Sequence, residues 1–332
     1  MAQSRLISTT ENLIDSVGEK PKNRWWDVLR TDKTTRNLTL LLMGLPAILY
    51  VFVFKYLTLI GVGLAFEDYR AADGILGSTW VWFKNFQFLF GSPQIWVALR
   101  NTLMYNALFI VIGTVMSLFL AFLVYEVYSS TMTRFYQTTL FFPQFISWVI
   151  VSYFLLTFLS AQDGLANKVL AFFGFDPIKW YSSPAYWPLV FVLLSIWKGA
   201  GSGSLLYLAA MLGIDPQYFE AARIDGANKW QEFRYITLPL LMPLIIIQLL
   251  ISIGYIFNSD FGLFYVATNL ANQQALIPAA ETVDTFVFRS LLKVGNVGMS
   301  AAAGLFQSVM GFILVLVSNW LVRRIDPDRS LF

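Results

Sequence analysis

The clearest chemical pattern in the sequence lies between positions 213 and 238. Asp215 followed by Pro216 predicts the start of a short helix, because an aspartate caps free N–H groups and proline fits the first helical position. Gly226 predicts the end of that helix, because glycine enters the left-handed conformation at little steric cost. The expected local structure is therefore a helix, a tight turn and a second helix.

The side chains of this segment suit the docking of a second body. Ala221 and Ala222 leave a surface of small side chains that a partner can approach closely. Glu220, Arg223 and Asp225 supply polar edges around that surface. We expect this loop to act through contact with a partner.

A second group of polar and aromatic residues lies within or beside long apolar segments. Such side chains are costly in hydrocarbon and usually face a bundle interior or a cavity. Aromatic rings can stack on the C–H faces of a sugar, while amides and carboxylates can hydrogen-bond its hydroxyls. The alternative is interhelical hydrogen bonding, worth about 0.6–2 kcal/mol per contact, and it is at least as well supported for any one residue. The residues predicted to line a substrate path are Asn106, Trp197, Gln248, Tyr255, Asn258 and Asp260.

The composition excludes much enzyme chemistry. The chain has no His and no Cys, so it lacks the commonest acid–base group, a thiolate nucleophile and a Cys-based metal site. It also has no Gly-x-x-x-x-Gly-Lys-Ser/Thr motif, so it cannot cradle ATP in that way. Gly199, Gly201 and Gly203 lack the strand–turn–helix context of a dinucleotide site, and we expect them to kink a helix or pack it closely. We expect no metal site, no cofactor on this chain and no catalytic residue.

Lipid is the solvent that the overall composition indicates. Of 332 residues, 57% are hydrophobic and 13% are charged, and the mean hydropathy is +0.61. Soluble domains carry about 25% charged residues. The net charge of +3 comes without a dense basic stripe, which excludes a nucleic-acid partner.

Several apolar segments are long enough for a helix to cross the membrane, which takes about 20 residues. They lie near Leu38–Leu59, Thr102–Tyr125, Tyr136–Leu159, Pro188–Leu212, Leu240–Asp260 and Gly304–Val322. The predicted fold is one all-α integral membrane domain with six transmembrane helices. Residues 282–293 are expected to form a short amphipathic helix in the last outer loop.

The distribution of Lys and Arg predicts the orientation, because basic residues are retained on the cytoplasmic side. With the N-terminus inside, the inner segments hold about twice as many of them as the outer loops. We therefore expect both termini to be cytoplasmic. The predicted division is a cytoplasmic N-terminal segment of residues 1–37, a transmembrane domain of residues 38–322 containing the cytoplasmic loop 213–238, and a cytoplasmic tail of residues 323–332.

The loop also carries a family resemblance. It resembles the EAA loop of binding-protein-dependent ABC importer permeases in Glu220-Ala221-Ala222, Gly226, Ile236, Leu238 and Pro239. Other segments resemble the sugar-permease branch, especially its oligosaccharide and polysaccharide members. These are residues 82–86, 101–103, 142–149, 197–198 and 284–289. The resemblance covers roughly residues 38–332.

This resemblance implies one half of a type I importer in a bacterial cytoplasmic (inner) membrane. The chain would pair with a second permease subunit as a heterodimer and bind two ATPase subunits, which would hold ATP and Mg. An extracytoplasmic solute-binding protein would deliver the carbohydrate, which would cross by alternating access. The coupling residues implied are Glu220, Ala221, Ala222, Asp225 and Gly226.

Two alternatives stay open on the sequence. One is an ABC permease for another polar solute, such as a peptide or an amino acid. The other is a polytopic membrane enzyme acting on lipid or polysaccharide, for which only Asp, Glu, Lys or Tyr could supply the acid–base group.

Overall fold

The computed structural model describes residues 33–325. The predictions for residues 1–32 and 326–332 lie outside this range, so the cytoplasmic position of both termini stays a prediction. The chain divides into two compact units at residues 60 and 61, and each is described by itself.

The described residues of the first unit form one helical stretch. It consists of α3 (Lys33–Val51), the π-helical turn η1 (Phe52–Tyr56) and the start of the 3-10 segment η2 (Leu57–Phe66). Residues Leu40–Phe66 are long and apolar enough to cross a membrane. This stretch matches the first predicted span, Leu38–Leu59, and extends beyond it.

The second unit begins with a small hairpin, in which β1 (Glu67–Asp68) pairs antiparallel with β2 (Thr79–Trp80). The helices α4 (Gly74–Gly77) and α5 (Lys84–Gly91) adjoin it. Asn85 is buried, and its side-chain amide donates to Ala65 O at 3.0 Å and Glu67 O at 2.9 Å. Asn85 therefore ties α5 to the hairpin.

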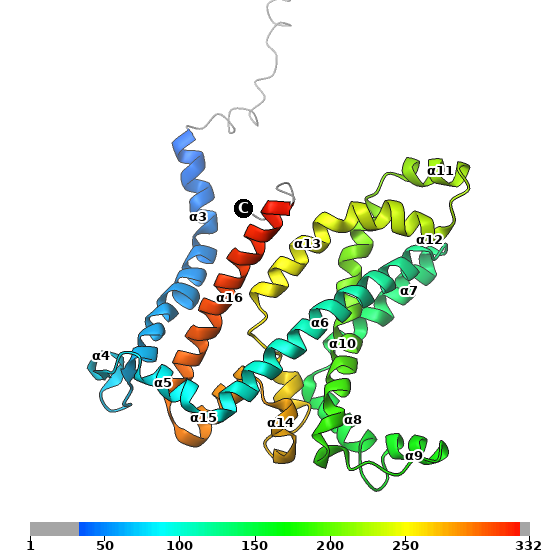
Figure 1. The fold of residues 1–332 in the computed structure, drawn as a ribbon. Helices are drawn as coiled ribbons and strands as arrows, with labels where there is room; N and C mark the ends of the chain where they lie inside the picture. The colour runs from blue at the N-terminus through cyan, green and yellow to red at the C-terminus, as the bar shows by residue number, and fades with distance from the viewer. Residues whose placement is uncertain (1–32, 326–332) are drawn as a thin grey trace, which may run out of the picture. The chain divides into compact units, whose positions relative to one another are not determined.

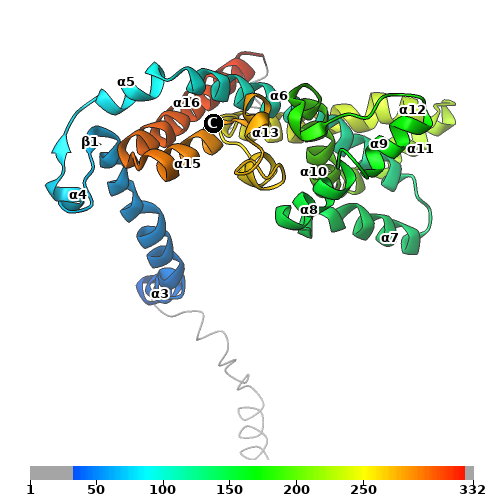
Figure 2. The same ribbon diagram turned by 90° about the horizontal axis from the view of Figure 1, so that it is seen from below.

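Four long helices of the second unit agree with predicted spans. They are α6 (Pro93–Tyr125), α10 (Trp187–Leu212), α13 (Leu238–Gly254) and α16 (Val297–Ile325). Their apolar composition and length suit a membrane crossing. α6 adjoins α5 and α15 (Val283–Val294) at one end and α7 (Ser130–Phe141) at the other, and α10 packs along much of its length (Figures 1 and 2).

The third predicted span is not one straight helix but a bent pair of helices, which gives the sixth span if the pair crosses the membrane together. Residues 136–159 include the end of α7, the 3-10 turn η3 (Phe142–Phe145) and α8 (Trp148–Phe158), with a bend of 90° at the break. Pro143 cannot donate a backbone hydrogen bond, so it favours a break here. Ser147 then caps α8 by accepting from the Ile150 N–H at 3.4 Å.

The fifth predicted span also ends earlier than expected, at Gly254 rather than Asp260. Asn258, Ser259 and Asp260 favour caps and turns over helix interiors because their side chains compete for backbone groups. The chain continues through η7 (Gly262–Val266), η8 (Gln274–Leu276) and α14 (Ile277–Ala280) to α15. The amphipathic helix expected at residues 282–293 is confirmed as α15, Val283–Val294.

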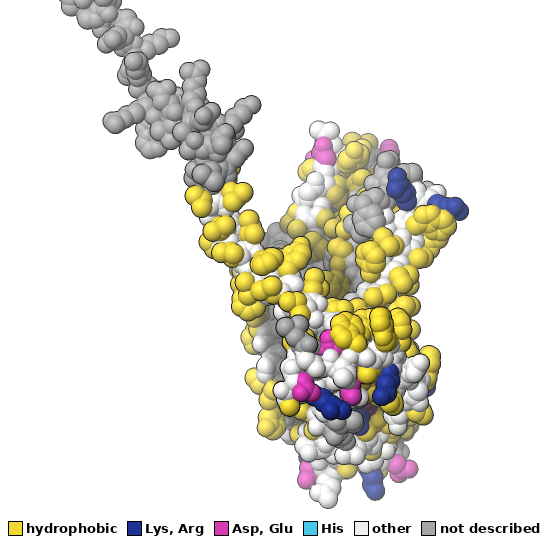
Figure 3. Space-filling model, turned by 90° about the vertical axis from the view of Figure 1, so that its left-hand side faces the viewer, with side chains coloured by type: hydrophobic (Ala, Val, Ile, Leu, Met, Phe, Trp, Pro, Cys, Tyr) yellow, Lys and Arg dark blue, Asp and Glu magenta, His cyan; other side chains and the backbone are white. Residues whose placement is uncertain are grey.

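The remaining elements lie at the two ends of the second unit. At one end are α8, α14 and α9 (Leu165–Phe172), and at the other are α11 (Pro216–Ile224) and α12 (Lys229–Glu232) (Figure 1). The short turns are η4 (Trp180–Ser182), η5 (Pro184–Tyr186) and η6 (Phe233–Thr237). On the face in Figure 3, the charged side chains of this unit gather towards its ends, with hydrophobic side chains between them. This distribution fits a membrane crossing.

Candidate functional site

The loop between α10 and α13 has the helix–turn–helix structure that its sequence predicted. The Asp215 side chain accepts a hydrogen bond from Gln217 N–H at 3.0 Å, and Pro216 is the first residue of α11. Gly226 has a φ of +83°, which is the left-handed conformation that favours glycine. Asn228 then begins α12 by forming a capping box with Gln231.

The predicted coupling residues lie together on α11 and in the turn that follows it. Glu220, Ala221, Asp225 and Gly226 are exposed, while Ala222 is half-buried. A shallow cavity of about 250 Å³ adjoins them, and its lining includes Ala222, Asp225, Gly226, Glu232 and Tyr235. The exposed surface of the loop therefore combines small and polar side chains with large apolar ones, since Tyr218, Ile224, Trp230 and Tyr235 are also exposed.

One ion pair joins two parts of this loop, and another joins the loop to α6. Arg223 Nε lies 2.8 Å from Glu232 Oε1, and Lys229 Nζ lies 3.0 Å from Glu126 Oε2. The hydrogen bond to Glu232 raises the pKa of the Arg223 guanidinium above its usual value. The sequence interpretation did not single out Glu126 or Glu232. For Glu126, the sequence offered one signal. It is an acidic residue at the end of α6, and it faces a segment that carries basic residues.

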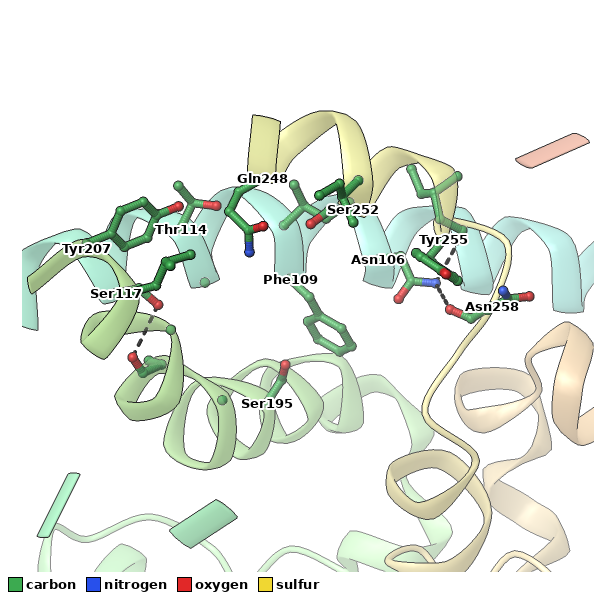
Figure 4. A pocket seen from close by; sticks show the side chains of 18 residues that line it. Asn106, Phe109, Thr114, Ser117, Ser195, Tyr207, Gln248, Ser252, Tyr255 and Asn258 are labelled. Atoms are coloured by element: carbon green, nitrogen blue, oxygen red, sulfur yellow. Dashed lines mark hydrogen bonds between the residues drawn. The ribbon is translucent and has the colours of Figure 1, made fainter. Parts of the chain in front are cut away.

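A cavity of about 420 Å³ lies between α6, α10, α13 and the segment after α13 (Figure 4). Four of the six residues predicted for a substrate path line it: Asn106, Gln248, Tyr255 and Asn258. They come from three different segments of the chain, so the fold brings them together as expected. Their role in binding a solute stays a prediction.

Further polar residues in the cavity wall were missed as path residues. Thr114 and Ser117 lie on α6, and Ser195 and Tyr207 lie on α10. Asn106, Gly113, Thr114 and Ser117 share one face of α6, because residues three, four and seven apart lie on the same side of a helix. That spacing of small and polar residues within an apolar span was the available signal.

Among the residues that the structure describes, no charged side chain lines this cavity. The side-chain amide of Asn106 is already hydrogen-bonded within the protein, since it donates to Ile256 O at 2.8 Å and Asn258 O at 2.9 Å. Ser117 likewise donates to Ala200 O at 3.2 Å. Within the described part of the chain, a larger set of lining side chains makes no hydrogen bond: Ser195, Gln248, Ser252, Tyr255 and Asn258. The wall therefore offers neutral donors and acceptors to a polar solute.

Trp197 and Asp260 do not reach this cavity. Trp197 lines a separate apolar cavity of about 940 Å³ between α8, α9 and α10. Asp260 caps η7, because its Oδ1 accepts from Gly262 N–H at 2.8 Å and Leu263 N–H at 3.2 Å. Its Oδ2 accepts from Trp148 Nε1–H at 3.0 Å. The structure therefore places both residues outside the group that could line one path.

Lys198 on α10 is bound at the break of the third span. Its Nζ donates to Gln144 O at 3.2 Å and to Ile146 O, and it lies 4.9 Å from the centre of the Trp148 ring. Because of the 90° bend, these carbonyl oxygens lie outside the regular hydrogen-bonding pattern of a helix. A cation can therefore donate hydrogen bonds to them. The ammonium group of Lys198 is therefore bound by groups of the protein itself.

Gly201 and Gly203 confirm the expectation of close packing, whereas a Cβ atom at Gly199 would meet no other atom within 4 Å. A Cβ atom at Gly201 would overlap Leu140 O of α7, and one at Gly203 would overlap Ser117 Oγ of α6. α10 runs continuously through this segment. Small residues therefore allow α6 and α7 to approach its backbone.

Residues 113–329 match the family described as "Binding-protein-dependent transport system inner membrane component". The chain is 36% identical over 296 residues to the polygalacturonan/rhamnogalacturonan transport system permease protein YteP of Bacillus subtilis, covering 89% of this chain and 91% of that protein. It is 34% identical over 304 residues to the protein LplB of the same organism, covering 92% and 93%.

The structure is also similar to solved structures. A chain of a bacterial alginate ABC transporter, crystallised with a periplasmic protein that holds an alginate pentasaccharide, matches with a TM-score of 0.78 at 32% identity, covering 92% of this chain and 98% of that one. A chain of a bacterial ABC transporter involved in importing the acidic polysaccharide alginate matches with a TM-score of 0.79 at 32% identity, covering 92% and 100%. This protein therefore belongs to the family of binding-protein-dependent transport system inner membrane components and has the fold of an ABC importer permease.

Proposed function

We propose that the chain conducts an oligosaccharide or polysaccharide into the cytoplasm through the cavity between α6, α10 and α13. The observation that carries this proposal is the set of unpaired neutral hydrogen-bonding groups in the cavity wall. Amides and hydroxyls match the hydroxyl groups of a sugar, and the Tyr255 ring offers a surface for its C–H face. The names of the relatives, which include polygalacturonan and alginate importers, support the same substrate class.

The energy would come from partner subunits. Two ATPase subunits would hold ATP and Mg, since this chain lacks the Gly-x-x-x-x-Gly-Lys-Ser/Thr loop. α11 would dock on one of them through Glu220, Ala221, Ala222, Asp225 and Gly226, of which all but the half-buried Ala222 are exposed. No part of the chain would itself act as an enzyme.

The cavity would be completed by a second, similar permease subunit, and an extracytoplasmic solute-binding protein would deliver the carbohydrate. ATP-driven movement of α11 would switch the cavity between inward-facing and outward-facing states. The complex would lie in the cytoplasmic (inner) membrane of a bacterium. Loop 213–238 would be cytoplasmic, as would residues 1–37 and 323–332 on either side of the permease domain of residues 38–322.

Two measurements test this assignment. The complex is purified through this chain, and a copurified ATPase and second permease are expected in the preparation. The solute-binding protein is then titrated with neutral oligosaccharides, uronate oligosaccharides and short peptides. Binding of an oligosaccharide supports the proposal, whereas binding of peptides alone favours the alternative of a permease for another polar solute.

The orientation can be tested separately because the chain has no native Cys. Single cysteines at Arg134 and Lys229 should be protected from an impermeant thiol reagent in sealed right-side-out cells. Cysteines at Lys168 and Arg289 should be labelled. Labelling at position 229 from outside would overturn the predicted topology.

A further inference from the structure

The inner end of α6 contacts the loop at several points. Phe122, Tyr125 and Glu126 lie on one face of this helix, because their spacing of three and four residues repeats close to one helical turn. The Phe122 ring lies 4.7 Å from the Phe233 ring of η6, measured between centroids. The Tyr125 ring lies 6.3 Å from the ring of Phe219, which is the buried aromatic residue of α11. One end of α6 is therefore packed against both helical parts of the loop.

Glu126 adds a charge at this junction. It is the C-cap residue of α6, where the helix dipole disfavours an anion. α6 alone therefore gives no reason for an acid at this position. Lys229 of α12 supplies one, since its Nζ lies 3.0 Å from Glu126 Oε2.

The charges continue from α12 to α11. Glu232 is buried, with a side chain that is 5% exposed, and its Oε2 lies 3.4 Å from Lys229 Nζ. Its Oε1 lies 2.8 Å from Arg223 Nε. The ion pairs thus form an alternating series that runs from α11 through α12 to α6: Arg223, Glu232, Lys229 and Glu126.

We infer that this series transmits the movement of α11 to α6, so that Glu126, Lys229 and Glu232 are positioning residues for transport. α12 leads directly through η6 into α13, which carries Gln248 and Ser252 of the cavity wall. The Lys229–Glu126 pair supplies the corresponding link to α6, which carries Asn106, Thr114 and Ser117. A displacement of the loop therefore moves two walls of the cavity together.

The outer half of α6 supports this arrangement. Asn106 donates to Ile256 O and Asn258 O, in the segment that follows α13. α6 and the α13 segment are thus joined at both ends of the cavity, by aromatic contacts and an ion pair on the inner side and by Asn106 on the outer side. The inference rests on the proposed function, because it assigns a task to the contacts of a coupling loop.

The Lys229–Glu126 pair can be changed without a large loss of stability. The two side chains are 45% and 26% exposed, and ion pairs with this exposure contribute little to the free energy of unfolding. Glu126→Gln, Lys229→Met and the double variant are made in the complete importer, with Arg134→Gln as the control. Arg134 is an exposed residue of α7 that makes no ion pair within the described chain.

The quantity to measure is the number of solute molecules carried per ATP hydrolysed in proteoliposomes. Each single variant is expected to lower it about fivefold or more, within the usual range of coupling between sites. The double variant should be no worse than Lys229→Met, because that variant already removes the pair with Glu126 together with the contact to Glu232. Lys229→Arg should restore most of the ratio, and Arg134→Gln and the thermal unfolding temperatures should stay near the wild-type values.

Wild-type ratios in Glu126→Gln and Lys229→Met, in a preparation whose wild type is coupled, would overturn the inference. Additive losses in the double variant would also overturn it, because they would show that the two residues act separately. If the wild-type complex itself shows no ATP-dependent uptake of any carbohydrate, the proposed function fails instead. The wild-type measurement therefore distinguishes the two failures.

Discussion

The indole Nε1–H of Trp148 donates a hydrogen bond to Asp260 Oδ2 at 3.0 Å, across 112 residues of sequence. This bond joins the first residue of α8, just after the break in the third span, to the cap of η7. Gly262 packs directly against the same indole ring, since a Cβ atom there would overlap it. Asp260 is therefore committed to holding these two segments together.

Asp260 and Asn258 should consequently respond differently to substitution. Asp260→Ala removes the acceptor for Trp148 and for two backbone N–H groups, so we expect a loss of about 1–3 kcal/mol in stability. Asn258→Ala removes a cavity side chain without a hydrogen bond, and should lower uptake while the unfolding temperature stays unchanged. Thermal unfolding and uptake of both variants decide the matter. A stable Asp260→Ala complex with altered ligand choice would contradict this division of roles.

Lys198→Met should destabilise the complex. The substitution keeps much of the side-chain length but leaves Gln144 O and Ile146 O without their donor, at a cost of about 1–3 kcal/mol. Lys168→Met is the matched control, because Lys168 is exposed on α9. The measurement is thermal unfolding of the purified complex. Equal unfolding temperatures for the two variants would show that Lys198 does not stabilise the break between α7 and α8.

The effect of a substitution at Gly226 should depend on how readily the new residue adopts the left-handed backbone conformation. A Cβ atom there would meet no other atom within 4 Å, so the effect of a side chain comes from the φ of +83°. Valine adopts this conformation poorly, whereas asparagine adopts it readily. We expect Gly226→Val to abolish ATP-driven uptake in an inserted complex and Gly226→Asn to retain most of it. Equal uptake by both variants would argue against a coupling role for the turn.

The glycines of α10 offer a second matched comparison. Gly201→Ala places a methyl group on Leu140 O, whereas Gly199→Ala meets nothing within 4 Å. Overpacking of this kind costs about 1–3 kcal/mol. Gly201→Ala should therefore lower the unfolding temperature, and Gly199→Ala should not. A tolerated Gly201→Ala variant would show that α7 and α10 are not packed as described.

Several features were predictable because they depend on local sequence. The caps at Asp215 and Gly226 were enough to predict the helix–turn–helix loop. The lengths of the apolar segments were enough to predict the spans. The break at Pro143 was harder to predict, since the residues around it are as apolar as an unbroken span. It is stabilised by Lys198, which is distant in sequence.

The cavity was predicted only in part for the same reason. Residue type identified Asn106, Gln248, Tyr255 and Asn258 as polar groups at membrane depth. Type alone could not distinguish Asp260, whose partners are Trp148 and its own following turn. Residue type also could not show which way the Trp197 side chain points from α10, because this depends on the helices that surround α10.

The most direct test of the account is ATP-dependent uptake of a labelled oligosaccharide into proteoliposomes that contain the complete importer and its solute-binding protein. The oligosaccharide is the one that the solute-binding protein selects in titration. The account predicts uptake that requires ATP and that falls in the Gln248→Ala, Asn258→Ala double variant without loss of complex yield. Uptake without ATP, or full uptake by that variant for every oligosaccharide tested, would contradict it.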